Sequence, residues 1–211
     1  MMILRFFYYL AVMKYKMKKN KGKKEARENK FLFSALIIAI IFLAGIFLFG
    51  GRGLVADRLL AKGNFFFNGG AYDLAKAAKY YKIAGFVDRK ASYPHYQLAR
   101  VYFMKTDFKS GLAEIDKALA LNPENKRAYY IRGLIDGYSE NWKAAEDDFQ
   151  KFVAWAPKEW AGYNDLAWAY YQDKKYQEAA KAAQDGLAVA PNNAWLLNGL
   201  GVSLQALGKN A

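Results

Sequence analysis

The chain has 211 residues, contains no cysteine and carries a formal net charge of +13. This length allows one or two domains. The lack of cysteine excludes disulfides, thiolate-bound zinc or iron–sulfur sites and a thiol nucleophile. The net charge would suggest binding to nucleic acid if it were spread over the whole chain.

The positive charge is instead concentrated at the N-terminus. Residues 1–30 hold ten Lys and Arg against two Glu, most densely from Lys14 to Lys30. We interpret residues 1–30 as a basic cytoplasmic tail, which could attract RNA or anionic lipid headgroups. The first thirteen residues are apolar but too short to cross a bilayer. They form a short interfacial anchor, or translation starts at Met17, the alternative we favour.

Residues 31–50 are predicted to form a transmembrane helix. No residue from Phe31 to Phe49 is charged, and a helix of that length would span about 28 Å, close to the thickness of the bilayer core. The basic flank predicts a cytoplasmic N-terminus and an extracytoplasmic remainder. A cleaved signal peptide is the alternative, but the flank offers only a poor cleavage site at Leu54-x-Ala56. We therefore expect a single-pass protein of the cytoplasmic (inner) membrane.

The rest of the sequence is a repeat with a period of 34 residues. Pro123, Pro157 and Pro191 are evenly spaced, and they close the runs ALNP, AWAP and AVAP. A fixed period of this length indicates that one supersecondary unit is stacked several times. With each proline at position 32 of the frame, the predicted units are 56–91 (divergent), 92–125, 126–159, 160–193 and a partial unit over 194–211.

Small and aromatic residues recur at fixed positions of this frame. Position 8 holds Ala99, Gly133, Ala167 and Gly201, position 20 holds Gly111, Ala145 and Ala179, and position 17 holds Phe108, Trp142 and Tyr176. The pattern resembles the tetratricopeptide repeat (TPR), a pair of antiparallel helices. The resemblance implies an all-α protein, an α-solenoid of antiparallel helix pairs (a TPR superhelix), which follows the one transmembrane helix predicted from the run Phe31 to Phe49.

Two parts of the repeat region depart from this pattern. In the middle unit, Arg132 and Asp136 replace large apolar residues, and Phe152 takes a small position, so we expect this unit to pack differently. The segment 194–211 has apolar residues all around its expected helix and corresponds to the first helix of a further repeat. We therefore expect either that the sequence is a fragment or that a partner covers this helix.

The resemblance also implies a binding groove. In TPR proteins the first helix of each unit lines a concave surface, and the corresponding residues here are aromatic, amide-bearing and basic. A surface of this kind suits an extended peptide or a partner helix. The alternative is that several rings merely pack between adjacent repeats. The implied groove residues are Tyr93, Tyr96, Arg100, Phe103, Arg127, Tyr130, Tyr138, Asn164, Trp168, Tyr171 and Asn198.

No catalytic or metal-binding pattern is present in the sequence. The single histidine, His95, falls at a packing position, and Asp147 and Asp148 lie beside Glu146 and Lys151 on an expected solvated face. Phosphate loops, metal-ligand spacings and nucleophile motifs are absent. The carboxylate clamp of chaperone-binding TPR domains is also missing from the matching positions. We predict that the chain is not an enzyme and needs no cofactor or metal.

These observations lead to one functional hypothesis and one alternative. The chain is predicted to be a membrane-anchored scaffold for protein–protein interaction, whose groove binds peptide segments or helices during envelope or secretory complex assembly. The alternative is a cytosol-facing targeting receptor or adaptor at a membrane. The expected partners are proteins in the groove, the bilayer around Phe31 to Phe49 and anionic headgroups at the basic tail. Nucleic acid is not expected, and the oligomeric state is left open.

Overall fold

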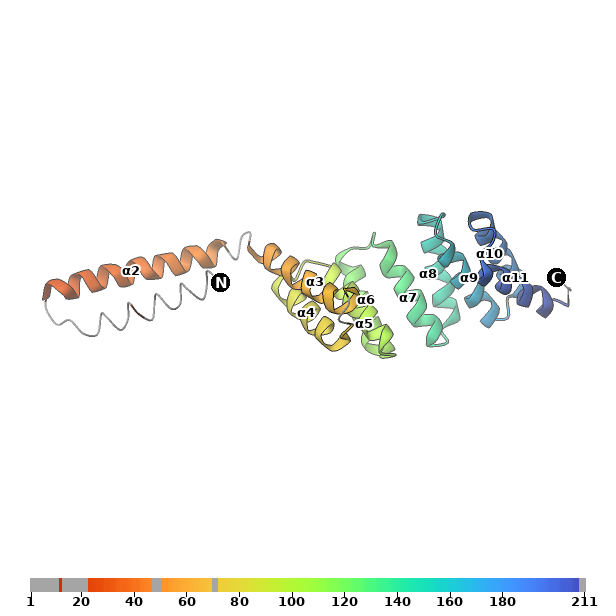
Figure 1. Ribbon diagram of the computed structural model, residues 1–211, viewed down its shortest axis with the longest axis horizontal. Helices are drawn as coiled ribbons and strands as arrows, with labels where there is room; N and C mark the ends of the chain where they lie inside the picture. The colour runs from red at the N-terminus through yellow and green to blue at the C-terminus, as the bar shows by residue number, and fades with distance from the viewer. Residues whose placement is uncertain (1–11, 13–22, 47–50, 70–71, 209–211) are drawn as a thin grey trace. The chain divides into compact units, whose positions relative to one another are not determined.

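The computed structural model describes residues 12, 23–46, 51–69 and 72–208, and the chain divides into two units, Met1–Arg52 and Gly53–Ala211 (Figure 1). The described residues contain helices and no strand, which confirms the predicted all-α class. Most of the basic tail lies outside them, including Lys14 and the alternative start at Met17.

The first unit contains helix α2, Lys23–Ile46. Among the helices of the described residues, none combines the length and the apolar character needed to cross a membrane. The first eight residues of α2 are mostly charged, and residues 47–50 of the predicted span lie outside the described part of the chain. The predicted transmembrane helix over 31–50 therefore has no support among the described helices. The same finding contradicts the predicted single-pass location in the inner membrane. The predicted roles in envelope assembly and as a membrane receptor depended on that location and are not supported.

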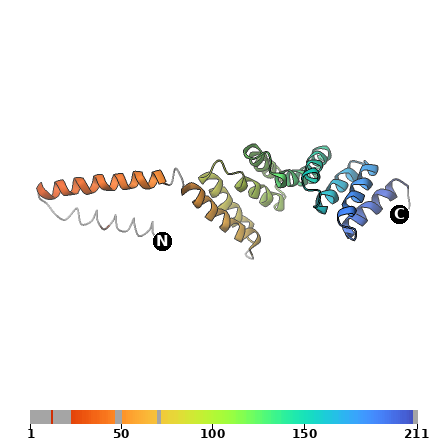
Figure 2. The ribbon, with the colours of Figure 1, turned by 90° about the horizontal axis from the view of Figure 1, so that it is seen from above.

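The second unit is a row of helices that run alternately up and down (Figures 1 and 2). From α4 onward successive helices pack on each other, and α5, α7, α9 and α11 also pack on one another in turn. The first helices of the pairs therefore share one face of the solenoid. Phe67 of α3 shares a core cluster with Ala77 and Tyr81 of α4. The helices are α3 (Arg52–Asn68), α4 (Leu74–Val87), α5 (Tyr93–Met104), α6 (Phe108–Leu121), α7 (Lys126–Tyr138), α8 (Trp142–Trp155), α9 (Trp160–Gln172), α10 (Tyr176–Val189) and α11 (Ala194–Ala206).

Local sequence explains where these helices begin and end. The side chains of Asp107, Asn125 and Asn193 each accept a hydrogen bond from a backbone N–H of the first turn, at α6, α7 and α11. The turn inside each full pair passes through one residue in the left-handed region, at φ 56° to 61°, and these residues recur at the repeat period. They are Thr106, Glu140 and Lys174.

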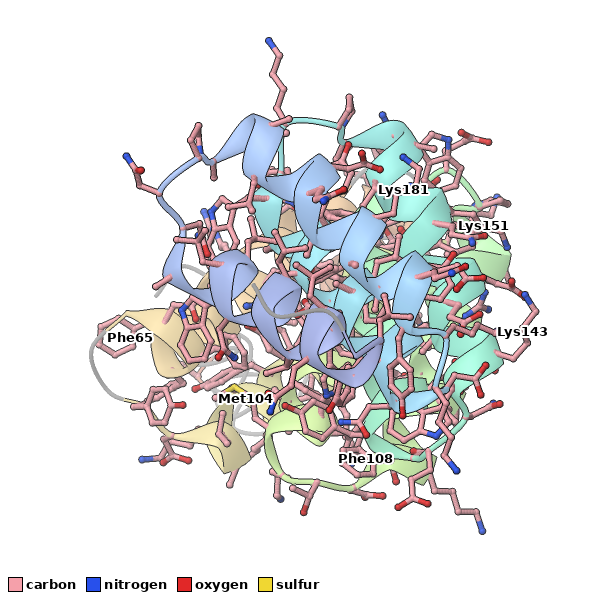
Figure 3. All side chains as sticks on the ribbon, turned by 90° about the vertical axis from the view of Figure 1, so that its right-hand side faces the viewer. Phe65, Met104, Phe108, Lys143, Lys151 and Lys181 are labelled. Carbon is pink, nitrogen blue, oxygen red and sulfur yellow. The ribbon has the colours of Figure 1, made fainter. Side chains whose placement is uncertain are left out.

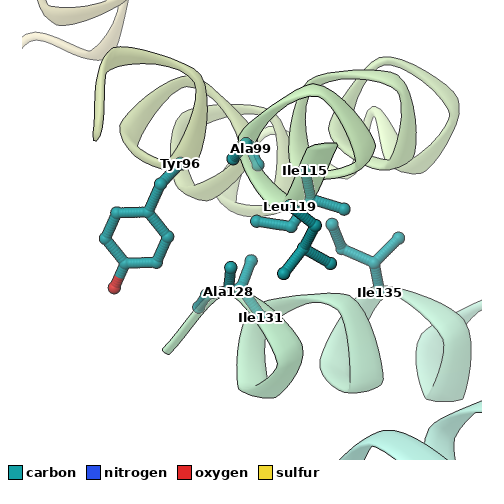
Figure 4. Packing of buried hydrophobic residues seen from close by; sticks show 8 residues of the cluster. Tyr96, Ala99, Ile115, Leu119, Ala128, Ile131 and Ile135 are labelled. Atoms are coloured by element: carbon teal, nitrogen blue, oxygen red, sulfur yellow. The ribbon is translucent and has the colours of Figure 1, made fainter. Parts of the chain in front are cut away.

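The core of the solenoid lies between consecutive pairs. Figure 4 shows one such layer, in which Ile115 and Leu119 of α6 meet Ile131 and Ile135 of α7, with Ala99 of α5 beside them. The small residues of position 8 make this approach possible. A Cβ atom added at Gly133 would lie only 2.8 Å from the ring of Phe149, which is fully buried. The glycine at position 8 of this unit therefore allows α7 and α8 to pack closely.

The middle unit contains a buried ionic cluster in place of apolar packing. The guanidinium of Arg132 donates to both carboxylate oxygens of Asp148, at 2.7 and 3.0 Å, and Lys175 Nζ donates to Glu146 at 2.7 Å. Glu146 and Asp148 are only 1% and 2% exposed. The prediction that Asp148 lies with Glu146 on a solvated face is therefore wrong, because each carboxylate is buried against a cation, Arg132 of α7 for Asp148 and Lys175 at the start of α10 for Glu146. Asp147 is exposed as predicted.

The helix predicted to be the first of a further repeat is α11. Leu196 is fully buried, whereas Leu200 and Leu207 are half-buried. Trp195 and Leu197 remain 69% and 50% exposed. The buried side of α11 packs on α9 and α10. Residues 209–211, at which the expected second helix would begin, lie outside the described part of the chain.

Candidate functional site

Ten of the eleven predicted groove residues line two hollows of the second unit. We call the first the basic hollow. It has a volume of about 830 Å³ and is formed by side chains of α3, α5, α7 and the segment from the end of α8 to the start of α9. Its predicted members are Tyr93, Tyr96, Arg100, Arg127 and Tyr130, and its other members are Asn64, Asn68, Gln97, Lys126, Ile131, Phe152, Trp155, Ala156, Glu159 and Ala161.

Arg100 is the central cation of the basic hollow. Its guanidinium lies 4.5 Å from the ring centroid of Phe67 and donates to Gln97 Oε1 at 2.8 Å. Gln97 is itself buried and donates to Asn64 Oδ1 at 2.9 Å, which fixes its amide. The cation is therefore held in place by an aromatic face and a hydrogen-bonded amide, and most of its N–H donors are left for a ligand.

We call the second hollow the acidic hollow. It has a volume of about 410 Å³ and is formed by side chains of α7, α9 and α11. It is mostly aromatic and amide-bearing, and its one charged side chain is that of Asp165. Its predicted members are Tyr138, Asn164, Trp168, Tyr171 and Asn198, and its other members are Leu134, Asp165, Ala167, Gln172, Trp195, Gly199 and Val202.

Asp165 links the two hollows. Tyr130, whose ring lines the basic hollow, donates its hydroxyl to Asp165 Oδ2 at 2.6 Å, and Asn164 donates to Oδ1 at 3.0 Å. Burial raises the pKa of the Asp165 carboxyl above its usual value. Burial also raises the pKa of the Tyr130 phenol, and the neighbouring Asp165 carboxylate adds to that effect. The two residues form a hydrogen-bonded link between the hollows.

Phe103 is the predicted groove residue that lines neither hollow. Its ring packs between repeats, with its centroid 5.5 Å from Tyr138 and 6.2 Å from Phe108. Tyr138 in turn lies 5.3 Å from Trp168. Phe103 thus follows the alternative reading, in which a ring at helical spacing serves packing. Tyr138 and Trp168 serve both purposes, because they join this row and also line the acidic hollow.

The frame could have identified two residues that the prediction missed. Aligning Gly63 with position 8 of the divergent unit puts Asn64 at position 9 and Asn68 at position 13, both of which are groove positions. Both line the basic hollow. The predicted groove residues were taken only from the units that begin at residue 92. Gln97 and Asp165 carry a weaker signal, since both occupy position 6, which the implied set does not include.

The candidate residues outside the groove have structural contacts. His95 Nδ1 lies 2.7 Å from Glu114 Oε2, and the Glu114 side chain is also bound by Lys117. Contact with Glu114 agrees with the packing role expected of His95. Within the described residues no cluster of His, Asp and Glu is arranged to hold a metal ion. That the chain is not an enzyme stays a prediction.

Comparisons with known proteins identify the fold. No model of a known protein family matches the chain. The small glutamine-rich tetratricopeptide repeat-containing protein 2 of Mycosarcoma maydis is 29% identical over 105 residues, which are 50% of this chain and 30% of that relative. The match thus covers less than a third of the relative's length.

Solved structures share the arrangement of helices over most of the chain. MamA 41-end from Desulfovibrio magneticus RS-1 has a TM-score of 0.68 at 22% identity, covering 72% of this chain and 85% of that one. YrrB, a TPR protein with an unusual peptide-binding site, has a TM-score of 0.63 at 20% identity, covering 71% of this chain and 76% of that one. At these identities the likeness shows the fold, a solenoid of tetratricopeptide repeats.

Proposed function

Because the second unit folds as a tetratricopeptide solenoid, we propose that the protein is a scaffold for protein–protein interaction whose groove binds an extended peptide segment or a helix of a partner. The groove consists of the basic and acidic hollows on the face shared by α5, α7, α9 and α11. The observation that carries the proposal is that ten residues implied by the repeat frame line these two hollows, which Tyr130 and Asp165 connect.

The chemistry of the groove supports a peptide ligand. Tyrosine and tryptophan rings offer large contact areas at low entropic cost, and they are enriched where proteins bind one another. Asn and Gln side chains can pair with the N–H and C=O groups of an extended backbone. The acidic hollow combines both classes, with Trp168 and Trp195 beside Asn164 and Asn198. The peptide-binding site of YrrB lends the proposal support by analogy of fold.

The proposal is tested with the full chain and a library of random 12-residue peptides displayed on phage. Peptides that bind the wild-type chain are synthesised, and their affinities are measured by isothermal titration calorimetry. We expect Trp168→Ala and Tyr130→Ala to weaken binding by tenfold or more, because each removes a ring from the groove. Lys181→Ala is the control, since Lys181 is exposed on α10 and lines neither hollow.

Two results would contradict the proposed function. One is a selection that yields no peptide binder of the folded chain. The other is a set of binders whose affinity is unchanged in both groove variants and reduced by Lys181→Ala. That result would place the binding surface on α10, outside the groove. Circular dichroism of each variant separates lost binding from lost folding.

A further inference from the structure

The groove differs from the outer helices, by which we mean the second helices of the pairs such as α8 and α10, in how its charges are neutralised. On the outer helices, cations pair with carboxylates of the same surface, as in the pairs Lys143–Asp147 at 2.7 Å and Lys181–Asp185 at 3.1 Å. Figure 3 shows Lys143, Lys151 and Lys181 together on one side of the unit, apart from Phe65 and Met104. The ion pairs of the described residues include neither Arg100, Arg127 nor Asp165. The groove charges therefore lack counter-charges within the described part of the chain.

The basic hollow suits a carboxylate. Arg100, Lys126 and Arg127 line it, against Glu159 as its one acidic member. Arg100 is half-buried, and a half-buried cation without a counter-ion has lost part of its hydration. A carboxylate would accept hydrogen bonds from the planar guanidinium in a two-pronged geometry, which Lys cannot offer. Arg100 also lies 5.8 Å from the ring centroid of Tyr96; burial raises the pKa of the Tyr96 phenol, and the charges of Arg100 and Arg127 oppose that rise.

The acidic hollow suits a cation. The residues that line it include no Lys or Arg. The Asp165 carboxylate is held by Tyr130 and Asn164, and each of its oxygens can accept a further hydrogen bond. Trp168, Tyr171 and Trp195 line the same hollow. A carboxylate among aromatic faces favours an ammonium or guanidinium group both by charge and by cation–π attraction.

From these two observations we propose that the groove selects a dipolar segment of its partner. An Asp or Glu side chain of the segment seats in the basic hollow at Arg100 and Arg127, and a Lys or Arg side chain of the same segment seats in the acidic hollow at Asp165. One segment can reach both sites, because Tyr130 lines the first hollow and bonds to Asp165 of the second. This inference rests on the proposed function and names the chemical class of its ligand.

The test uses the same selected peptides and asks for their charge pattern. We expect binders that contain both an acidic and a basic residue, separated along the sequence. Replacing either charge of such a peptide with Asn should weaken binding about tenfold, which corresponds to about 1.4 kcal/mol. Arg127→Glu should cause a comparable loss, and exchanging the acidic residue of the peptide for Lys should restore binding to that variant.

The variants also separate the two hollows. Asp165→Asn should weaken peptides that carry the basic residue and leave peptides that lack it unchanged. Lys181→Glu, which introduces the same change of charge as Arg127→Glu but on an outer helix, should leave all affinities unchanged. The basic N-terminal tail is identical in every variant, so a difference between variants reports the groove. Binding is measured at 0.15 M salt to limit screening differences.

Peptides that bind in the groove equally well with neutral residues, or with charges of a single sign, would overturn this inference while leaving the proposed function standing. Two separate classes of binder, acidic peptides sensitive to Arg127→Glu and basic peptides sensitive to Asp165→Asn, would also overturn it, because the hollows would then serve different ligands. A selection without any groove binder would contradict the proposed function itself.

Discussion

At the scale of single residues, Asp165 shows how burial sets the behaviour of the groove. Its carboxyl has a raised pKa because the folded chain shields it from water. The folded state therefore binds a proton more readily than the unfolded state, and the contribution of Asp165 to stability falls as the pH rises through the two pKa values. The ionised Asp165 side chain lowers the free energy of unfolding at neutral pH, which agrees with a role of this residue in binding rather than in stability.

This linkage gives a testable pH dependence. Asp165→Asn removes the titration, so the free energy of unfolding of the wild-type chain relative to the variant should increase as the pH is lowered from about 7 toward about 4. Urea unfolding at a series of pH values measures the difference. The difference between the two proteins isolates Asp165 from Asp136 and Glu146, whose pKa values burial also raises. A difference that does not change with pH would contradict the assignment.

Gly133 and Gly201 occupy the same position of the repeat in different surroundings. In Gly133→Ala the new methyl group would meet the buried Phe149 ring, so we expect a loss of about 1–2 kcal/mol despite the better helix propensity of Ala. At Gly201 no atom lies within 4 Å of an added Cβ, so Gly201→Ala should stabilise by about 0.5–1 kcal/mol. Chemical denaturation of both variants measures the two effects. Equal effects would show that packing does not distinguish the sites.

At the scale of helices, the contact between α7 and α8 depends on a pair of charges that replaces an apolar contact. Arg132→Leu would restore the residue type of the repeat pattern, yet it would leave Asp148 buried without its main partner. We expect a loss of about 2 kcal/mol, below the usual range for a broken buried pair because Lys151 remains 3.9 Å from Asp148. The double variant Arg132→Leu, Asp148→Leu should recover most of this loss, as measured by thermal and urea unfolding.

The outcome of that double-mutant cycle decides between two accounts of α7. Recovery in the double variant means that the pair substitutes for apolar packing and that neither charge is needed alone. Additive losses would instead mean that Arg132 and Asp148 make independent contributions, against the geometry of their two hydrogen bonds.

The same pair shows where prediction from sequence succeeded and where it stopped. The period and its small residues were sufficient to predict the helical solenoid. Position in a repeat determines which side a residue faces, and ten of the eleven residues assigned to the groove line the two hollows; their role in binding stays a prediction. The period could not show that Arg132 and Asp148 meet, since that contact joins a departure from the pattern, Arg132, to a residue of another helix that was expected to face solvent. For the run Phe31–Phe49, composition alone suggested a membrane span, and no helix of the described residues, α2 included, is long and apolar enough to provide one.

At the scale of the whole solenoid, the stability of each helix depends on its packing against the adjacent helices. The helices from α4 to α11 pack mainly on the helices directly before and after them. Central pairs are therefore supported on both sides, and the helices at the ends of the solenoid on one side only. We expect amide hydrogen exchange to be slowest in α6, α7 and α8 and faster in α11, whose Trp195 and Leu197 are exposed. Mass spectrometry of peptic peptides after timed exchange measures this. Uniform protection along the unit would indicate a single cooperative block instead.

The placement of the tryptophans has a practical consequence for optical experiments. The chain has five tryptophans; Trp155 lines the basic hollow and Trp168 and Trp195 line the acidic one. Indole emission shifts toward the blue when water around the ring is displaced. A chain that keeps only Trp155 and one that keeps only Trp195 would thus report the filling of each hollow separately and without a label. The groove carries its own fluorophores, one set for each end.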